Sequence, residues 1–105
     1  MKPRIARGKY GSRRTKVDGI TFASQKEARR YGELKLLQKA GQISDLKLQV
    51  RFKLVQTVTY VADFEYHDRL KGAKVVEDVK GFLTPVYRRK RKLMKEQHGI
   101  EIKET

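Results

Sequence analysis

The sequence predicts a small α/β (α+β) domain with the element order α-β-β-β-α-β, preceded by a β-hairpin and a basic N-terminal arm. A helix-capping pattern begins at Ser24, three segments of alternating apolar and polar residues follow, and a Thr-Pro pair at residues 84–85 opens a second helical segment. The 105 residues suffice for one core, so we expect a flexible basic arm over residues 1–14 and a single domain over residues 15–105.

The first half of the domain is expected to contain a hairpin and a helix. An Asp-Gly pair at residues 18–19 lies between β-branched residues, a pattern typical of a two-residue hairpin turn. Ser24 and Glu27 form a capping box, and helix-forming residues continue from there until a glycine stops them. These signals predict a helix over residues 24–40.

The second half is expected to contain three strands, a helix and a short final strand. In the second strand, Val58, Tyr60, Ala62 and Phe64 should share one face, with Asp63 on the other. A glycine after His98 should end the second helix. The expected strands cover residues 46–54, 56–66, 73–80 and 100–103, and the expected helix covers residues 85–98.

The charge of the chain is concentrated in two segments. The formal net charge is +14, and residues 1–16 carry seven basic residues while residues 86–95 carry six, with no acidic residue in either segment. The rest of the chain is nearly neutral. Such segments neutralise phosphates and give salt-sensitive binding to nucleic acid. A solvated surface that serves solubility is the plainer alternative, whereas an acidic membrane fits less well because neither segment has a broad apolar face.

The composition excludes several classes of protein. Without cysteine there is no disulfide framework and no thiolate zinc site. No run approaches the ~18 apolar residues of a membrane span, and the charged N-terminus lacks the apolar stretch of a signal peptide. We therefore expect a cytoplasmic protein that has an anionic partner and does not act at a membrane.

Three polar residues are candidates for chemistry. Asp78 and Lys80 are two residues apart and should project from one face of a strand. If that strand forms a hairpin with the preceding one, Asp63 lies beside Asp78, and two adjacent carboxylates favour a hard cation such as Mg²⁺ between them. A surface ion pair is the alternative. Strand alternation selects Asp78 over Glu77, although a bulge would reverse that choice.

Glu27 has two candidate roles. As the third helical position after Ser24 it completes the capping box. It also shares i, i+4, i+7 spacing with Tyr31 and Leu34, so its carboxylate could lie on the face that packs against the sheet and complete a metal site.

These residues resemble the PD-(D/E)XK nuclease signature, and the element order resembles the common core of that superfamily, a mixed central sheet flanked by helices as in restriction endonucleases. Over residues 9–104 the chain is more closely similar to a family of small phage proteins. These proteins are described as a domain of unknown function or as endonucleases and are thought similar to Holliday-junction resolvases. The motifs that carry this resemblance are Ser24-x-x-Glu27-Ala28-x-x-Tyr31, Gln49-x-x-Phe52, Tyr60-x-x-Asp63-Phe64 and Val75-Val76-Glu77-Asp78-Val79-Lys80-Gly81.

The resemblance implies a metal-dependent endodeoxyribonuclease that leaves 5′-phosphate and 3′-hydroxyl ends. Asp63, Asp78 and the backbone carbonyl of Val79 would bind Mg²⁺ or Mn²⁺, Glu27 would assist as a further ligand or through a water, and Lys80 would position the attacking water. The resemblance also implies a branched DNA substrate such as a four-way junction, a symmetric homodimer, and a phage or prophage origin in a bacterial host.

From charge alone, the arm and the second helix are expected to contact the DNA backbone. Two alternatives to a self-sufficient nuclease stay open. One is a non-catalytic, basic nucleic-acid-binding protein, and the other is a nuclease subunit that needs a partner. The residues expected to contact DNA are Arg4, Arg7, Lys9, Arg13 and Arg14 in the arm and Arg88, Arg89, Lys90, Arg91 and Lys92 in the helix.

Overall fold

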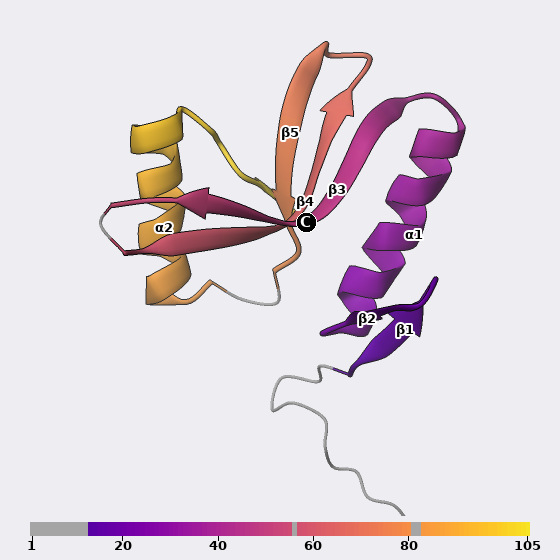
Figure 1. Cartoon of the computed structure of the whole chain (residues 1–105), viewed down its shortest axis with the longest axis horizontal. Coiled ribbons are helices and arrows are strands. Elements are labelled where there is room, and N and C mark those ends of the chain that lie inside the picture. Colours follow the sequence, from indigo (N-terminus) through magenta and orange to yellow (C-terminus); the bar gives the residue numbers. More distant parts are fainter. Residues whose placement is uncertain (1–12, 56, 81–82) are drawn as a thin grey trace, which may run out of the picture.

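The computed structural model describes residues 13–55, 57–80 and 83–105. Figure 1 shows helices on either side of the sheet and a separate hairpin next to the first helix. Of the predicted arm, only Arg13 and Arg14 belong to the described residues, and both are exposed. In chain order the elements are β1 (Thr15–Val17), β2 (Ile20–Phe22), α1 (Gln25–Lys39), β3 (Ile43–Lys53), β4 (Thr59–Asp68), β5 (Ala73–Asp78), α2 (Pro85–His98) and β6 (Lys103–Glu104).

The larger sheet contains both antiparallel and parallel pairs. Its strand order is β3-β4-β5-β6, in which β4 pairs antiparallel with both neighbours. The chain leaves β5, passes through α2 and returns as β6, which therefore pairs parallel to β5. The molecule is a mixed α+β domain, which confirms the predicted class and the predicted element order.

Both helices begin and end where the capping signals predict. The Ser24 hydroxyl accepts a hydrogen bond from the Glu27 backbone N–H at 3.1 Å, and Thr84 caps α2 in the same way ahead of Pro85. Gly99 ends α2 in the left-handed conformation that glycine adopts without strain. Among the residues that the structure describes, no helix combines the length and apolar character needed to cross a membrane.

Several strand limits differ from the sequence prediction. β3 begins at Ile43 rather than at residue 46, because a bulge between Ser44 and Lys47, where Asp45 has a φ of +56°, interrupts the alternation that marks a strand. β4 covers residues 59–68 rather than 56–66, and Gln56 lies outside the described residues. β5 ends at residue 78 and β6 covers only residues 103–104, because the β5–β6 ladder has just two pairs.

The domain has two apolar clusters rather than one, and β4 contributes to both. Phe64 and Tyr66 pack with α1 and β2, whereas Tyr60 and Ala62 pack with α2. The stripe predicted on β4 is therefore divided, with Tyr60 and Ala62 in the α2 cluster and Phe64 in the α1 cluster. Only residues 64–68 of β4 pair with β5, and beyond them β3 and β4 form a two-stranded ribbon, which twists more than a wide sheet.

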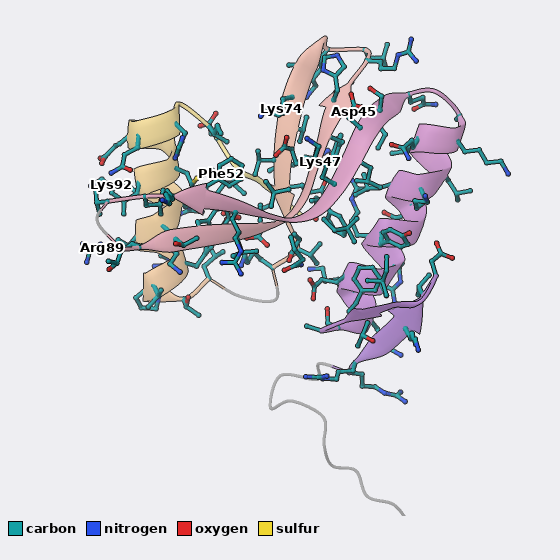
Figure 2. The ribbon with its side chains drawn as sticks, viewed as in Figure 1. Asp45, Lys47, Phe52, Lys74, Arg89 and Lys92 are labelled. Atoms are coloured by element: carbon teal, nitrogen blue, oxygen red, sulfur yellow. The ribbon has the colours of Figure 1, made fainter. Side chains whose placement is uncertain are left out.

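The change of direction is visible along β3. In Figure 2, Asp45 and Lys47 lie on the half of β3 beside α1, and Phe52 lies on the half that approaches α2. Partly buried Leu46 and Leu48 accordingly pack against the α1 cluster, and Phe52 packs against the α2 cluster. The twist turns the ribbon at the level of Asp63, between the two cores.

The β1–β2 hairpin forms the two-residue turn that the sequence predicts. Asp18 and Gly19 both have positive φ, as the favoured hairpin turns require. The Tyr31 hydroxyl donates to the Asp18 carboxylate at 3.0 Å, and the rings of Phe22 and Tyr31 lie 5.0 Å apart. These contacts hold the hairpin against α1, where it forms one side of the cleft described next.

Candidate active site

A cleft of about 650 Å³ lies between the β1–β2 hairpin, the first turn of α1 and the centre of the larger sheet. The hairpin forms one side, the twisted part of β3 and β4 forms the other, and the end of β5 with the two residues after it completes the lining. All five residues for which the sequence and the resemblance suggest a catalytic or metal-binding role line this cleft: Glu27, Asp63, Asp78, Val79 and Lys80.

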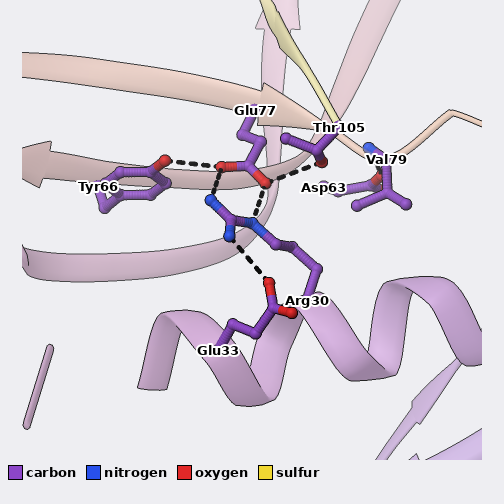
Figure 3. Close-up of polar contacts among 7 residues, drawn as sticks. All are labelled: Arg30, Glu33, Asp63, Tyr66, Glu77, Val79 and Thr105. Atoms are coloured by element: carbon purple, nitrogen blue, oxygen red, sulfur yellow. Dashed lines mark hydrogen bonds and ion pairs between the residues drawn. The ribbon is translucent and has the colours of Figure 1, made fainter. Parts of the chain in front are cut away.

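Asp63 and Asp78 lie opposite each other on β4 and β5. The β4–β5 ladder ends with Phe64 paired to Glu77, and one further step along both strands brings Asp63 opposite Asp78. The Val79 backbone N–H donates to Asp63 Oδ2 at 2.8 Å, which ties the centre of β4 to the end of β5 (Figure 3). Strand alternation and the register of the β4–β5 hairpin together bring the two carboxylates to one place.

The electrostatics of this pair are unfavourable without a cation. Burial and the neighbouring Asp63 carboxylate raise the pKa of Asp78 to about 7, against the opposing effects of the Tyr60 hydroxyl and the Lys80 ammonium. Burial also raises the pKa of Asp63, the Glu27 carboxylate adds to that rise, and contacts with Asp78 and the Val79 N–H oppose it. Two partly desolvated carboxylates are therefore held together with too little positive charge around them.

Asp78 and Lys80 are held by aromatic residues of the α2 cluster. The Tyr60 hydroxyl donates to Asp78 Oδ2, and Lys80 Nζ lies 3.2 Å from the same oxygen. Lys80 Nζ also lies 4.0 Å from the centre of the Tyr87 ring, a cation–π contact that keeps the ammonium beside the carboxylate.

The backbone of Glu27 takes part in the helix cap, and its side chain lies in the cleft. Its backbone N–H is the donor to the capping hydroxyl of Ser24, while its side chain lines the cleft and is close enough to Asp63 to raise the pKa of that carboxyl. Tyr31 and Leu34 are buried, as the i, i+4, i+7 spacing predicts. The residue whose backbone donates to the cap is thus also the one whose side chain lines the cleft.

Glu77 faces away from the cleft, toward α1. Its carboxylate accepts hydrogen bonds from Arg30 Nε and Nη2, from the Tyr66 hydroxyl at 2.6 Å and from the Thr105 hydroxyl at 3.0 Å (Figure 3). Burial alone would raise the pKa of Glu77, but the bonds from Arg30 and Tyr66 hold it below its usual value. Strand alternation therefore selects Asp78 for the cleft, and no bulge reverses the choice.

Sequence reasoning missed several residues around this strand. Tyr60 belongs to the apolar stripe predicted on β4, yet its hydroxyl contacts Asp78, and the Tyr87 ring contacts Lys80. Arg30 follows Glu27 by three residues, so it lies on the same side of α1, and this spacing is the one signal that could have found it. Thr105, whose backbone bonds to Asp78 and Lys80, carries no such signal.

The cleft supplies oxygen donors but not a complete metal cage. Within residues 13–55, 57–80 and 83–105, no group of three or more His, Cys, Asp or Glu side chains is arranged to hold a metal ion. Asp63 and Asp78 give two carboxylates whose pKa values are raised chiefly by burial. This donor set fits a hard divalent cation that takes its other ligands from backbone oxygen, water or a bound phosphate.

The basic residues expected to contact DNA fall into two described groups. Arg13 and Arg14 precede β1, while Arg88, Arg89 and Lys92 are exposed on α2, on the opposite side of the molecule (Figures 1 and 2). Within α2, Lys90 and Arg91 are partly buried, and Arg91 pairs with Glu104 at 2.7 Å. Arg4, Arg7 and Lys9 lie outside the described residues.

The chain belongs to a family described as protein of unknown function (DUF1064), whose model matches residues 7–105. No curated protein matches the chain at a significant level, and neither does any solved structure. The family match covers nearly the whole domain and identifies no nuclease family, so an assignment of activity depends on the chemistry of the cleft.

Proposed function

We propose that the protein is a metal-dependent endodeoxyribonuclease of the PD-(D/E)XK type that cuts DNA to 5′-phosphate and 3′-hydroxyl ends. The observation that carries this proposal is the arrangement of Asp63 opposite Asp78, with Lys80 beside Asp78 and Glu27 in the same cleft. The element order and the crossover from β5 through α2 to a parallel β6 are also those expected of this superfamily's core.

Asp63 and Asp78 would hold Mg²⁺ or Mn²⁺, together with the Val79 carbonyl. The Val79 N–H fixes one oxygen of Asp63, and Tyr60 fixes one oxygen of Asp78, so each carboxylate is oriented and keeps its second oxygen for a ligand. When bound, such an ion polarises the scissile phosphate and activates a water. Glu27, on the α1 side of the cleft, would contact the ion directly or through a water.

Lys80 would orient the attacking water and offset the negative charge that develops on the phosphate. Its ammonium is held between the Asp78 carboxylate and the Tyr87 ring, so it lies beside the metal ligands before substrate binds. Its backbone is fixed as well, because the Lys80 N–H donates to the Thr105 carbonyl at 3.0 Å. The Lys80 ammonium beside the carboxylates distinguishes this site from a pair of carboxylates that only binds a metal ion.

The remaining basic residues would bind the DNA backbone. Arg13 and Arg14 continue into the hairpin that forms one side of the cleft, and the exposed cations of α2 lie across the sheet from them. A DNA molecule that contacts both groups of basic residues would run across the cleft. Two opposed cuts in a branched DNA, such as a four-way junction, would require a homodimer with one cleft for each strand, in a cytoplasm that contains replicating or recombining DNA.

The proposal is tested by cleavage of a synthetic four-way junction and a matched linear duplex, with Mg²⁺, Mn²⁺ or EDTA. Asp78→Asn should reduce the cleavage rate by at least about 10²–10³-fold because it removes one metal ligand. Glu101→Gln removes the same charge at a side chain that is 80% exposed and should cleave like the wild type. A preference for the junction would identify the branched substrate.

Two alternatives predict a different result. A non-catalytic nucleic-acid-binding protein accounts for the +14 charge and for the incomplete cluster of ligands in the described residues. It predicts tight binding without cleavage in either metal, as does a subunit that needs a partner. Removing both carboxylates with Asp63→Ala and Asp78→Ala should leave metal-free DNA binding equal or tighter, and weaker binding would contradict the enzyme proposal.

A further inference from the structure

Gln49 lies in the middle of β3 with a left-handed backbone, at a φ of +52°. The β3–β4 ladder pairs Leu48 with Phe64 and Val50 with Ala62, but it skips the residues between them, Gln49 and Asp63. Glycine adopts this backbone freely and asparagine and aspartate tolerate it, whereas a longer side chain rarely does so inside a strand. A strained residue therefore faces the candidate metal ligand directly across the ladder.

The turning of the ribbon explains the backbone of Gln49 but not its side chain. β3 and β4 pass from the α1 cluster to the α2 cluster at this level, and a left-handed residue is one way to make such a bend. Glycine would make the same bend without strain. The bend therefore does not explain why this position holds glutamine rather than glycine. Strained backbones of this kind are concentrated at binding and catalytic sites.

The cleft provides that reason, because it has few groups that can donate to a phosphate. Gln49 is exposed and lines the cleft. Among the described residues that line the cleft, those with side-chain N–H or O–H donors are Thr21, Gln49 and Lys80. Lys80 is already held by Asp78 and Tyr87. A neutral amide can donate to a phosphate oxygen without forming an ion pair with the carboxylates opposite it.

We infer that Gln49 is a substrate-binding residue whose Nε2 donates a hydrogen bond to a phosphate of the DNA strand in the cleft, next to the one that is cut. This inference rests on the proposed nuclease function and adds to it a contact on the β3 side. The strand then lies between the β1–β2 hairpin and Gln49, with Asp63 and Asp78 beneath the scissile phosphate. The strained backbone is retained because it turns the amide toward this strand.

The test compares Gln49→Gly with Asp45→Gly. Asp45 is also exposed and left-handed, at a φ of +56°, but it lies at the bulge beside α1 and does not line the cleft (Figure 2). Glycine relieves the strained backbone of Gln49, so Gln49→Gly should raise Tm by about 4 °C, and Asp45→Gly should raise it less because aspartate tolerates this backbone better. Only Gln49→Gly should weaken binding of a synthetic duplex, by about tenfold in fluorescence anisotropy with Ca²⁺, and slow cleavage with Mg²⁺ by at least as much.

Gln49→Ala separates the side chain from the backbone, because alanine lacks the amide but keeps the strain. It should lose as much DNA affinity as Gln49→Gly, without the gain in Tm. Unchanged binding and cleavage in both variants would overturn the inference and leave Gln49 as a bend residue only. If Gln49→Gly alone lost affinity, the backbone would be responsible and the inference would also fall.

The anisotropy measurement keeps this inference separate from the proposed function. A wild type that binds duplex in Ca²⁺ but cuts no DNA in Mg²⁺ or Mn²⁺ would contradict the nuclease proposal. The contribution of Gln49 to strand binding would still be decided, by the tenfold loss or by its absence. Asp45→Gly removes a negative charge, so any electrostatic effect of the control would tighten DNA binding and could not imitate the expected loss.

Discussion

Glu77 and Asp78 are consecutive residues of β5, and both carboxylates are buried, but the two faces of the strand treat them in opposite ways. On the α1 face, Glu77 is surrounded by donors from Arg30, Tyr66 and Thr105, and its pKa is lowered. On the cleft face, burial and then the neighbouring Asp63 carboxylate raise the pKa of Asp78 to about 7. A buried charge with a full set of partners stabilises a fold, whereas one left short of positive charge is prepared for a ligand.

Glu77→Gln should show the largest effect on stability. It leaves the Arg30 guanidinium facing an amide inside the α1 interface, and we expect a loss of about 3 kcal/mol in the free energy of unfolding, measured by urea denaturation. Because the pKa of Glu77 is lowered on folding, its contribution is present at neutral pH and disappears as the pH falls through that lowered value. A loss below about 1 kcal/mol at pH 7 would mean that the Arg30 pair is not structural.

Asp78→Asn should have the opposite sign. The pKa of Asp78 is raised on folding, so its protonated form favours the folded state fully below about pH 4, and that contribution is lost as the pH rises through about 7. The neutral amide does not titrate, so the metal-free variant should gain stability over the wild type as the pH rises from 4 to 7, reaching on the order of 1–3 kcal/mol at pH 8.

Thermal unfolding in EDTA across this pH range measures the gain, with Glu101→Gln as the control for charge removal. Saturating Mg²⁺ at pH 8 should stabilise the wild type and leave Asp78→Asn almost unchanged. A gain that does not vary with pH would show that Asp78 ionises as freely in the folded protein as in the unfolded chain.

Tyr60→Phe and Tyr66→Phe should show the smallest effects and the cleanest contrast. Each removes one hydroxyl donor from one of the two carboxylates, worth about 1 kcal/mol. Tyr60→Phe should raise the pKa of Asp78 further and weaken Mg²⁺ binding at pH 7 by several-fold, whereas Tyr66→Phe should lower stability and leave Mg²⁺ affinity unchanged. Calorimetric Mg²⁺ titrations of both variants measure this, and equal effects would remove the distinction between the faces.

The parts of the molecule that follow local rules could be predicted from the sequence. The caps at Ser24 and Thr84 determine where the two helices begin, and the turn at Asp18 determines where the hairpin reverses. Each of these signals acts within four residues. The choice of Asp78 over Glu77 needed only the two-residue period of strands, whereas its position beside Asp63 also required the two strands to pair as a hairpin. Predictions of which face a side chain occupies hold wherever the strand pairing is regular.

The parts that depend on distant contacts could not be predicted. The bulge at Asp45 interrupts the period of β3, and Gln49 has a left-handed backbone within a register that continues on both sides of it, yet no neighbouring residue type predicts either feature. The division of the β4 stripe between two clusters arises because β5 is shorter than β4, a tertiary property. The roles of Tyr60 and Arg30 likewise depend on which strand or helix packs opposite them.

The bonds made by Thr105 impose an order on how the cleft can be completed. Its N–H donates to the Asp78 carbonyl, its own carbonyl accepts from Lys80, and its hydroxyl reaches Glu77. A ribosome delivers residue 105 long after Asp63, Asp78 and Lys80. A growing chain therefore holds every proposed catalytic group before the residue that makes these three contacts is in place. The geometry of the site is therefore completed last, by a residue that contributes no reactive side chain. A growing chain lacks this geometry until Thr105 has been synthesised.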